Sequence, residues 1–361
     1  MRGWLALLAF IVLLFAPHRT GAEDLSVRLD RLVEQESLDS PVPGLAVAVV
    51  HHGRLVHLST HGEARAGVPL APTHVFHTAS ISKTVTALAV AMLAQEGQFS
   101  LDARFAELVP EFRMDDPRAG TLTLRQMLSH TSGMPDVEDY GWHDPNYDSS
   151  AAEDYMMTLG NRSLLFDPGS NRQYSNLAYD LLAVVVARYS GMPFEDFART
   201  RVLRPAGMLA SDFFHPAIPP RYRTSGHEGE NPAPLDYHPY NREHAPSSTL
   251  NASLIDMVQY ARMYLSSAAV DGQAMVSESV LRELWRDQSG DGRNGLAWFR
   301  YRDEDMRTVY HRGRDNGYVS RISLYPDQGH AIIILANWDR YDTDPLFFAL
   351  VREIFPPASA Q

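Results

Sequence analysis

A serine and a lysine three positions apart form the first group in this chain that could do covalent chemistry. Lys83 is the only lysine among the 32 Lys and Arg residues, and Ser80 precedes it by three positions. Residues at this spacing share one face of a helix, so a hydroxyl and an amine can meet there. A lysine can lose its proton when burial or a positive field lowers its pKa, whereas an arginine stays protonated. The pair therefore predicts a nucleophilic serine activated by a lysine base.

The residues that follow predict the helix that would position this pair. Positions 84–93 are rich in Ala, Val and Leu on all sides, which is typical of a buried helix. Ser80 would then lie at the helix N-terminus, where backbone N–H groups and the dipole stabilise negative charge and depress the pKa of Lys83. The spacing alone is a weak signal, because a serine often falls three positions before a lysine by chance. A surface lysine in an arginine-rich chain is the competing interpretation.

A second polar group precedes another apolar helix, expected over 177–189 and ended by Gly191. Tyr174 and Asn176 lie in the loop that enters this helix. Taken alone, Asn176 is more simply interpreted as a helix N-cap and Tyr174 as a packing aromatic.

Composition limits the classes of function. The chain has 361 residues, 45% of them hydrophobic, so it can bury a sizeable core. A net charge of −12 argues against nucleic acid and anionic membrane surfaces as partners. The chain contains no cysteine, which excludes disulfides and lipidated cysteines. Its 15 histidines show no metal-ligand spacing, and His51 and His52 fall in an expected hairpin, so we predict no metal site.

Residues 1–22 have the pattern of an export signal. Arg2 gives a positive start, an apolar run follows from Trp4 to Ala16, and small residues precede Glu23. The run is short for a membrane span, so we expect cleavage and no stable span afterwards, with an uncleaved anchor as the alternative. The pattern predicts a periplasmic or secreted bacterial protein.

The remaining pattern predicts an α/β protein of the α+β type. Strands are expected near both chain ends and helices between them, which favours an antiparallel sheet built from both termini and flanked by helices. The expected strands are 45–50, 55–58, 296–301, 308–311, 318–325 and 331–335, and further helices are expected at 25–33, 254–265, 277–285 and 345–354. Residues 212–246 show no periodicity and are interpreted, together with 135–160, as walls of a binding site.

We therefore expect one domain over 23–361 with two lobes. The sheet lobe would comprise about 23–75 and 290–361, and a mostly helical inserted lobe about 76–289. Oligomeric state is left open.

Three motifs in this order resemble those of the serine β-lactamase and penicillin-binding protein family. They are Ser80-Ile81-Ser82-Lys83, Tyr174-Ser175-Asn176 and His311-Arg312-Gly313. The resemblance spans about 40–340 and is closest to the branch of class C β-lactamases, D-alanyl-D-alanine carboxypeptidases, D-aminopeptidases and lactamase-like esterases. It implies a two-lobed β-lactamase-like fold with the site between the lobes.

The resemblance also implies a role for each motif residue. Ser80 attacks a carbonyl carbon and Lys83 removes the serine proton. Tyr174, with a depressed pKa, passes a proton to the leaving group, while Asn176 binds the acyl chain and holds Lys83. The backbone N–H groups of Ser80 and Arg314 form the oxyanion hole. No metal or organic cofactor is required, and His130 is expected to be structural.

The third motif departs from the Lys-Ser/Thr-Gly form common in the family. His311 is expected to donate a hydrogen bond towards Tyr174. Arg312 would either bind a substrate carboxylate or exclude it by bulk, Arg314 adds a second charge, and Gly313 completes the motif.

The resemblance thus implies an exported serine hydrolase acting on a D-amino-acid peptide, of carboxypeptidase or aminopeptidase type, or on an ester. A class C-type β-lactamase and a non-catalytic cell-wall-binding relative are the alternatives. The expected partner is a small molecule or peptide, such as a peptidoglycan fragment or a β-lactam.

Overall fold

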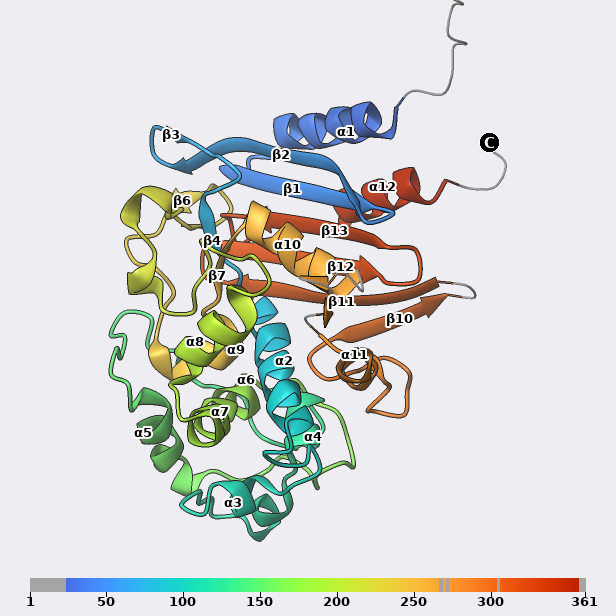
Figure 1. Ribbon diagram of the computed structural model, residues 1–361. Coiled ribbons are helices and arrows are strands. Elements are labelled where there is room, and N and C mark those ends of the chain that lie inside the picture. Colours follow the sequence, from blue (N-terminus) through green and yellow to red (C-terminus); the bar gives the residue numbers. More distant parts are fainter. Residues whose placement is uncertain (1–23, 266–268, 271–272, 275, 304–305, 357–361) are drawn as a thin grey trace, which may run out of the picture.

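An antiparallel sheet of seven strands, in the order β10-β11-β12-β13-β1-β2-β3, forms the upper half of the computed structural model (Figure 1). The structure describes residues 24–265, 269–270, 273–274, 276–303 and 306–356. The expected signal peptide at 1–22 lies outside them. The strands are β1 Gly44–His51, β2 Arg54–Arg65, β3 Val68–Pro69, β10 Phe299–Asp303, β11 Met306–Asp315, β12 Tyr318–Tyr325 and β13 His330–Ala336. Because β1 pairs with β13, both chain ends build the sheet centre, which confirms the predicted fold class.

The central strands are continuous apolar runs because both faces of the sheet are buried. In β1, alternate residues enter two separate cores: Ala46, Ala48 and Val50 on one face, and Leu45, Val47 and Val49 on the other. Helix α10 (Leu254–Leu265) covers the first face, and α1 (Leu25–Asp39) and α12 (Asp344–Ile354) lie across the second (Figure 1). The first face continues into the helical lobe.

Helix α2 (Ser82–Gln95) is the central element of the helical lobe and connects it to the sheet (Figure 1). It is buried almost throughout, as its all-round apolar pattern predicts. Around it lie α3 Phe105–Leu108, α4 Leu124–Leu128, α5 Ala151–Met157, α6 Asn176–Asp180, α7 Leu182–Ser190, α8 Phe194–Phe197, α9 Ala245–Ser248 and α11 Glu278–Trp285. Short strand pairs complete the fold: β4 Val75–His77 with β7 Asn251–Ser253, β5 His227–Glu228 with β6 Ala233–Pro234, and β8 Ala269–Val270 with β9 Gln273–Ala274.

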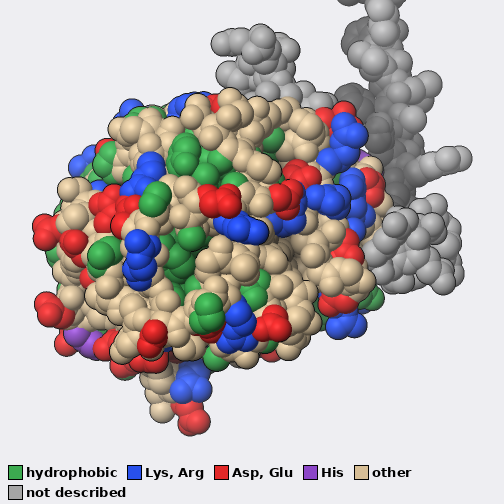
Figure 2. Space-filling model, turned by 90° about the horizontal axis from the view of Figure 1, so that it is seen from below, with side chains coloured by type: hydrophobic (Ala, Val, Ile, Leu, Met, Phe, Trp, Pro, Cys, Tyr) green, Lys and Arg blue, Asp and Glu red, His purple; other side chains and the backbone are tan. Residues whose placement is uncertain are grey.

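Seen from the helical end, acidic and basic side chains are interspersed among apolar ones, so neither sign forms a continuous field on this face (Figure 2). None of the helices among the described residues has the length and apolar character needed to cross a membrane.

The sequence prediction made β2, β11 and α1 too short, and it misplaced the start of one strand and the continuity of one helix. The strand expected from residue 296 begins only at Phe299, because the backbone N–H groups of Leu296 and Ala297 donate to the carbonyls of Leu284 and Leu128. Ala297 also takes a positive φ of 62°, which interrupts an extended strand. The helix expected over 177–189 is divided at Leu181 into α6 and α7, and Gly191 ends α7 with φ 71°, as predicted.

Candidate active site

Ser80 lies in η1 (Ala79–Ile81), a 3-10 helix of one turn directly before α2. Ala79 has a φ of 48°, a left-handed conformation that is unfavourable for a residue with a side chain. Two hydrogen bonds hold this turn: the Ser82 hydroxyl donates to the Ala79 carbonyl at 2.6 Å, and the Leu250 N–H donates to the Ser82 hydroxyl at 2.9 Å. The strained turn therefore presents Ser80 in a fixed position between the two lobes.

Lys83 is fully buried on the first turn of α2, and its amine faces Ser80. Its Nζ lies 3.2 Å from the Ser80 Oγ and 2.8 Å from the carbonyl oxygen of Ser247. It also lies 2.5 Å from the Asn176 Oδ1. The surface-lysine interpretation is therefore wrong, and the amine is held at hydrogen-bond distance from the serine hydroxyl.

Burial lowers the pKa of Lys83 to about 8, even though the negative charges of Asp180, Asp315 and Asp136 oppose this change. The direction agrees with the sequence prediction. Desolvation, rather than the helix terminus, is the largest cause. An amine with this pKa is partly neutral near neutral pH and can accept the serine proton.

Asn176 begins α6, but the residue that caps this helix is Ser175, whose Oγ accepts from the Ala178 N–H at 3.0 Å. The N-cap interpretation of Asn176 is therefore wrong. Its Oδ1 accepts from Lys83, while its Nδ2 donates to an Asp136 carboxylate oxygen at 3.1 Å. Asp136 thereby fixes the orientation of the amide and, through it, the position of the lysine.

Tyr174 lines the same cavity as Ser80, and its ring centroid is 4.9 Å from the Lys83 Nζ. It stacks on His130 with a centroid distance of 4.2 Å, so His130 supports the ring from behind. Burial raises the pKa of Tyr174 well above its usual range, although the neighbouring Ser80 hydroxyl opposes the rise. The prediction of a depressed pKa is wrong, because desolvation, together with the negative charges of Asp315, Asp136 and Asp180, exceeds the effect of the Ser80 hydrogen bond. Tyr174 is therefore a protonated phenol that can donate a proton, and the Lys83 amine can accept one.

His311 is buried beside Tyr174, with ring centroids 6.4 Å apart. Its Nδ1 lies 2.7 Å from the Arg312 carbonyl oxygen, which can only accept, so Nδ1 carries the proton. Burial and the charge of Lys83 lower the pKa of His311 to about 3, so the ring is neutral and Nε2 holds a lone pair. The expectation that His311 donates towards Tyr174 is therefore wrong in this tautomer: His311 can only accept there.

The rest of the third motif divides between the two faces of β11. A side chain at Gly313 would meet the Thr78 carbonyl oxygen at 2.2 Å, so glycine is needed for the strand to approach the Ser80 turn. Arg312 donates from Nη2 to an Asp344 carboxylate oxygen at 2.6 Å, and Arg314 donates to the Tyr341 carbonyl oxygen at 3.4 Å. The guanidinium of Arg312 thus has a carboxylate partner within the protein.

A cavity of about 450 Å³ opens over Ser80. It is lined by Ser80, Tyr140, Tyr174, Asn176, Phe299, His311, Arg312, Gly313, Arg314, Asp315, Val319, Asp342 and Thr343. Strand β10 pairs with β11 only as far as Tyr310, so residues 311–315 pair with β12 alone and turn their other backbone edge to the cavity. Such an edge can supply the N–H group of an oxyanion hole.

The structure brings together all eight residues predicted for the site, seven of them at the cavity and Lys83 buried behind Ser80. The expected walls are only partly correct. Tyr140 from 135–160 lines the cavity, whereas no residue of 212–246 does. Sequence reasoning missed Asp136, Tyr140, Phe299 and Asp315, which stand outside the three motifs and carry no spacing signal of their own.

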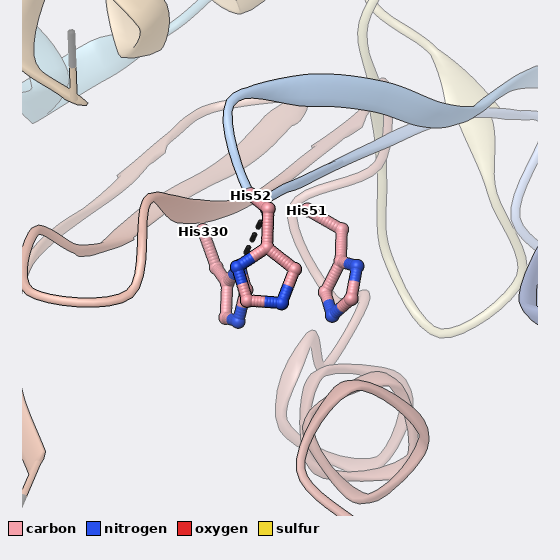
Figure 3. A group of neighbouring side chains, drawn as sticks. All are labelled: His51, His52 and His330. Atoms are coloured by element: carbon pink, nitrogen blue, oxygen red, sulfur yellow. Dashed lines mark hydrogen bonds between the residues drawn. The ribbon is translucent and has the colours of Figure 1, made fainter.

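Three histidines far from this site lie side by side: His51 and His52 at the β1–β2 turn and His330 at the start of β13 (Figure 3). No spacing in the sequence indicated this group, because His330 is 278 positions from His52. The His52 backbone N–H donates to the His330 Nδ1 at 2.9 Å, so the proton of the neutral ring is on Nε2. Nδ1 of His330 accepts a hydrogen bond and Nε2 carries a proton, so neither nitrogen has a free lone pair for a metal ion. We therefore infer that the three histidines stabilise the β1–β2 hairpin.

The histidine cluster predicts a pH-dependent stability. Burial and the neighbouring His51 and His52 lower the pKa of His330 to about 4. Protonation then favours the unfolded chain, so this stabilisation is complete above the ordinary histidine pKa of 6.5 and is lost as the pH falls towards 4. His330→Asn removes the titration and keeps an acceptor for His52. The measured quantity is the difference in unfolding free energy between the wild type and this variant, obtained by urea denaturation. We expect this difference to fall by about 1–2 kcal/mol when the pH is lowered from 7.5 to 4.5. A constant difference would contradict the assignment.

The fold and the Ser80–Lys83–Tyr174 site define a serine hydrolase of the β-lactamase and penicillin-binding protein class. A family model described as Beta-lactamase matches residues 29–349, and the chain belongs to this family.

Among curated relatives, Protein flp of Staphylococcus aureus (strain COL) is 26% identical over 326 residues, covering 87% of this chain and 63% of that protein. The chain therefore spans less than two thirds of that relative. Among solved structures, a class C β-lactamase has a TM-score of 0.78 at 19% identity, covering 93% of this chain and 97% of the other. The D-amino acid amidase of Ochrobactrum anthropi SV3 has a TM-score of 0.75 at 21% identity, with coverages of 92% and 98%. At these identities the structural likeness concerns the fold.

Proposed function

We propose that this protein is an exported serine hydrolase that cleaves a D-amino-acid peptide or an ester through a covalent Ser80 acyl ester. The observation that carries the proposal is the buried amine of Lys83, with a pKa of about 8, 3.2 Å from the Ser80 hydroxyl. Export rests on the pattern of residues 1–22, and the site of action would be the periplasm or the medium.

The reaction follows from the protonation states of the site. Lys83 takes the Ser80 proton as the serine oxygen bonds to the substrate carbonyl carbon, and backbone N–H groups of Ser80 and Arg314 stabilise the oxyanion. The bond to the leaving nitrogen or oxygen then breaks as Tyr174 donates its proton to the departing atom, and Lys83 returns a proton to Tyr174. Water attacks the ester in the second half-reaction, which releases the acid and restores the Ser80 hydroxyl.

The class C β-lactamase alternative is less well supported. It needs a cationic group for the carboxylate of the drug, and the Arg312 guanidinium is paired with Asp344 at 2.6 Å. The non-catalytic alternative would give no role to a buried lysine whose pKa is lowered to about 8.

Intact-protein mass spectrometry over time tests the proposal. The protein is incubated with a fluorophosphonate and, separately, with a penicillin, and Ser80→Ala is the control. We expect a fluorophosphonate adduct that is absent from the variant. A short-lived penicillin adduct with released product would instead favour a β-lactamase, and a persistent one a penicillin-binding carboxypeptidase. Failure of every probe, together with no ester turnover, would overturn the proposal.

A further inference from the structure

The carboxylate of Asp315 lies at the end of β11 and lines the cavity over Ser80. Its side chain is 14% exposed, and its Oδ2 accepts a hydrogen bond from the His77 Nε2 at 2.8 Å. Within the described part of the chain, Oδ1 accepts no hydrogen bond, and no Lys or Arg side chain pairs with Asp315. A nearly buried carboxylate is costly unless a cation compensates its charge. The charge of Asp315 acts on Lys83, but no hydrogen bond joins the two side chains in the described structure, so Asp315 can still accept from a cationic group.

The alternation of β11 separates this carboxylate from the arginines of the third motif. Successive strand side chains point to opposite faces, so Gly313 and Asp315 share the face that contacts the Ser80 turn. Arg312 and Arg314 belong to the other face and bond to Asp344 and to the Tyr341 carbonyl. The cationic side chains of the motif are therefore turned away from Asp315.

The other carboxylates near the nucleophile are already engaged. Asp136 bonds to Asn176, and Asp180 pairs with His244 at 2.8 Å; neither lines the cavity. Asp342 does line it but is exposed to solvent. Arg312 and Arg314 also line the cavity, but at exposed positions on the other face of β11. Among the charged residues that line the cavity, Asp315 is thus the one that is partly buried.

Aromatic side chains border the same carboxylate. Tyr140 lines the cavity and stacks on Trp142 with centroids 4.7 Å apart, and Trp142 lies 6.5 Å from the ring of His77. Tyr140 and Asp315 line the same cavity, and the charge of Asp315 adds to burial in raising the pKa of Tyr140. A carboxylate beside aromatic rings is the environment that binds an ammonium group.

We propose that Asp315 is the subsite for the free α-ammonium group of the substrate's acyl part, so that the substrates are amino-acid amides, amino-acid esters or peptides with a free N-terminus. This inference rests on the proposed hydrolase function and selects its aminopeptidase type over its carboxypeptidase type. Asp315 follows directly after Arg314, the residue assigned to the oxyanion hole, and one strand residue spans about 3.3 Å. An ammonium group two bonds from the attacked carbonyl carbon can therefore reach the Asp315 carboxylate.

Two esters that differ only in this group test the inference. D-Phenylalanine methyl ester carries the ammonium, and methyl 3-phenylpropionate lacks it; the L-ester is assayed alongside. The readout is the ratio of kcat/KM for the amino ester to that for the ester without the amine, at about pH 6, where an α-amino group is mostly protonated. We expect the wild type to prefer an amino ester, and Asp315→Asn to lower this ratio by about 50-fold, as loss of a charge-assisted hydrogen bond implies.

Asp342→Asn is the matched control, because it removes one negative charge from the same cavity at an exposed position. It should leave the ratio within about threefold of the wild type, since exposed charges contribute little. Asparagine at 315 still accepts from His77, which guards against a purely structural effect. An unchanged ratio in Asp315→Asn, an equal loss on both esters, or an equal fall in Asp342→Asn would overturn the inference. A wild type that cleaves both esters without preference refutes the subsite alone, whereas no cleavage and no Ser80 adduct refutes the hydrolase itself.

Discussion

Lys83→Arg is expected to lower kcat/KM for a cleaved ester by about 10⁴-fold, because it keeps the positive charge and removes the base. In the wild type, burial lowers the pKa of Lys83 to about 8, so kcat/KM should rise with pH and level off above about 8. The sign follows from the chemistry, since only the neutral amine can take the Ser80 proton. Arginine stays protonated throughout this range, so the variant's residual rate should lack the rising limb.

Lys83→Met separates the base from the charge. If Lys83 acts only through its positive charge, Arg should retain activity and Met should lose it; if it acts as the base, both variants lose activity to a similar extent. Thermal unfolding of each variant checks that the buried site still folds. Substantial turnover by Lys83→Arg would show that Ser80 is activated by another group.

Tyr174→Phe is expected to lower kcat by about 10³-fold while leaving the fold intact. The variant keeps the ring that stacks on His130 at 4.2 Å and loses only the hydroxyl. Burial keeps the pKa of Tyr174 above its usual range, so the wild-type residue is a protonated donor for the leaving group. The loss should therefore be larger for an amide, whose leaving nitrogen needs a proton, than for an activated aryl ester, whose leaving group departs as an anion.

Tyr179→Phe provides the matched control. Tyr179 is also buried near Lys83, with its ring centroid 5.6 Å from Nζ, but its hydroxyl donates to the Leu128 carbonyl and it does not line the cavity. This variant should lose some stability and keep most of its turnover. If both variants lose activity equally, or if Tyr174→Phe discriminates no further against amides, Tyr174 is a packing residue rather than a proton donor.

The sequence predicted the architecture because the relevant signals are local. The apolar runs of β1 and β13 and the all-round apolar pattern of α2 describe burial directly, and burial on both sides places these elements at the centre of a fold. Boundaries were less accurate. The start of β10 depends on hydrogen bonds from Leu296 and Ala297 to distant carbonyls, which no local pattern records.

For the site, residue types alone indicated the nucleophile and its base. A single lysine in an arginine-rich chain marks a position where a removable proton matters, and the spacing to Ser80 gives it a partner. Protonation states were predicted less well. Tyr174 and His311 were both assigned the wrong behaviour, because the pKa of a buried group depends on desolvation and on the tautomer fixed by its neighbours.

The sequence by itself thus determined the fold class and the chemical identity of the Ser80–Lys83 pair. Only the tertiary structure decided which charges the substrate meets. Strand alternation turns Arg312 towards Asp344 and leaves Asp315 in the cavity, bonded to His77 from 238 positions away. Local periodicity can assign residues to alternate faces of a strand, but what each face contacts is set by packing between segments that are distant in the chain.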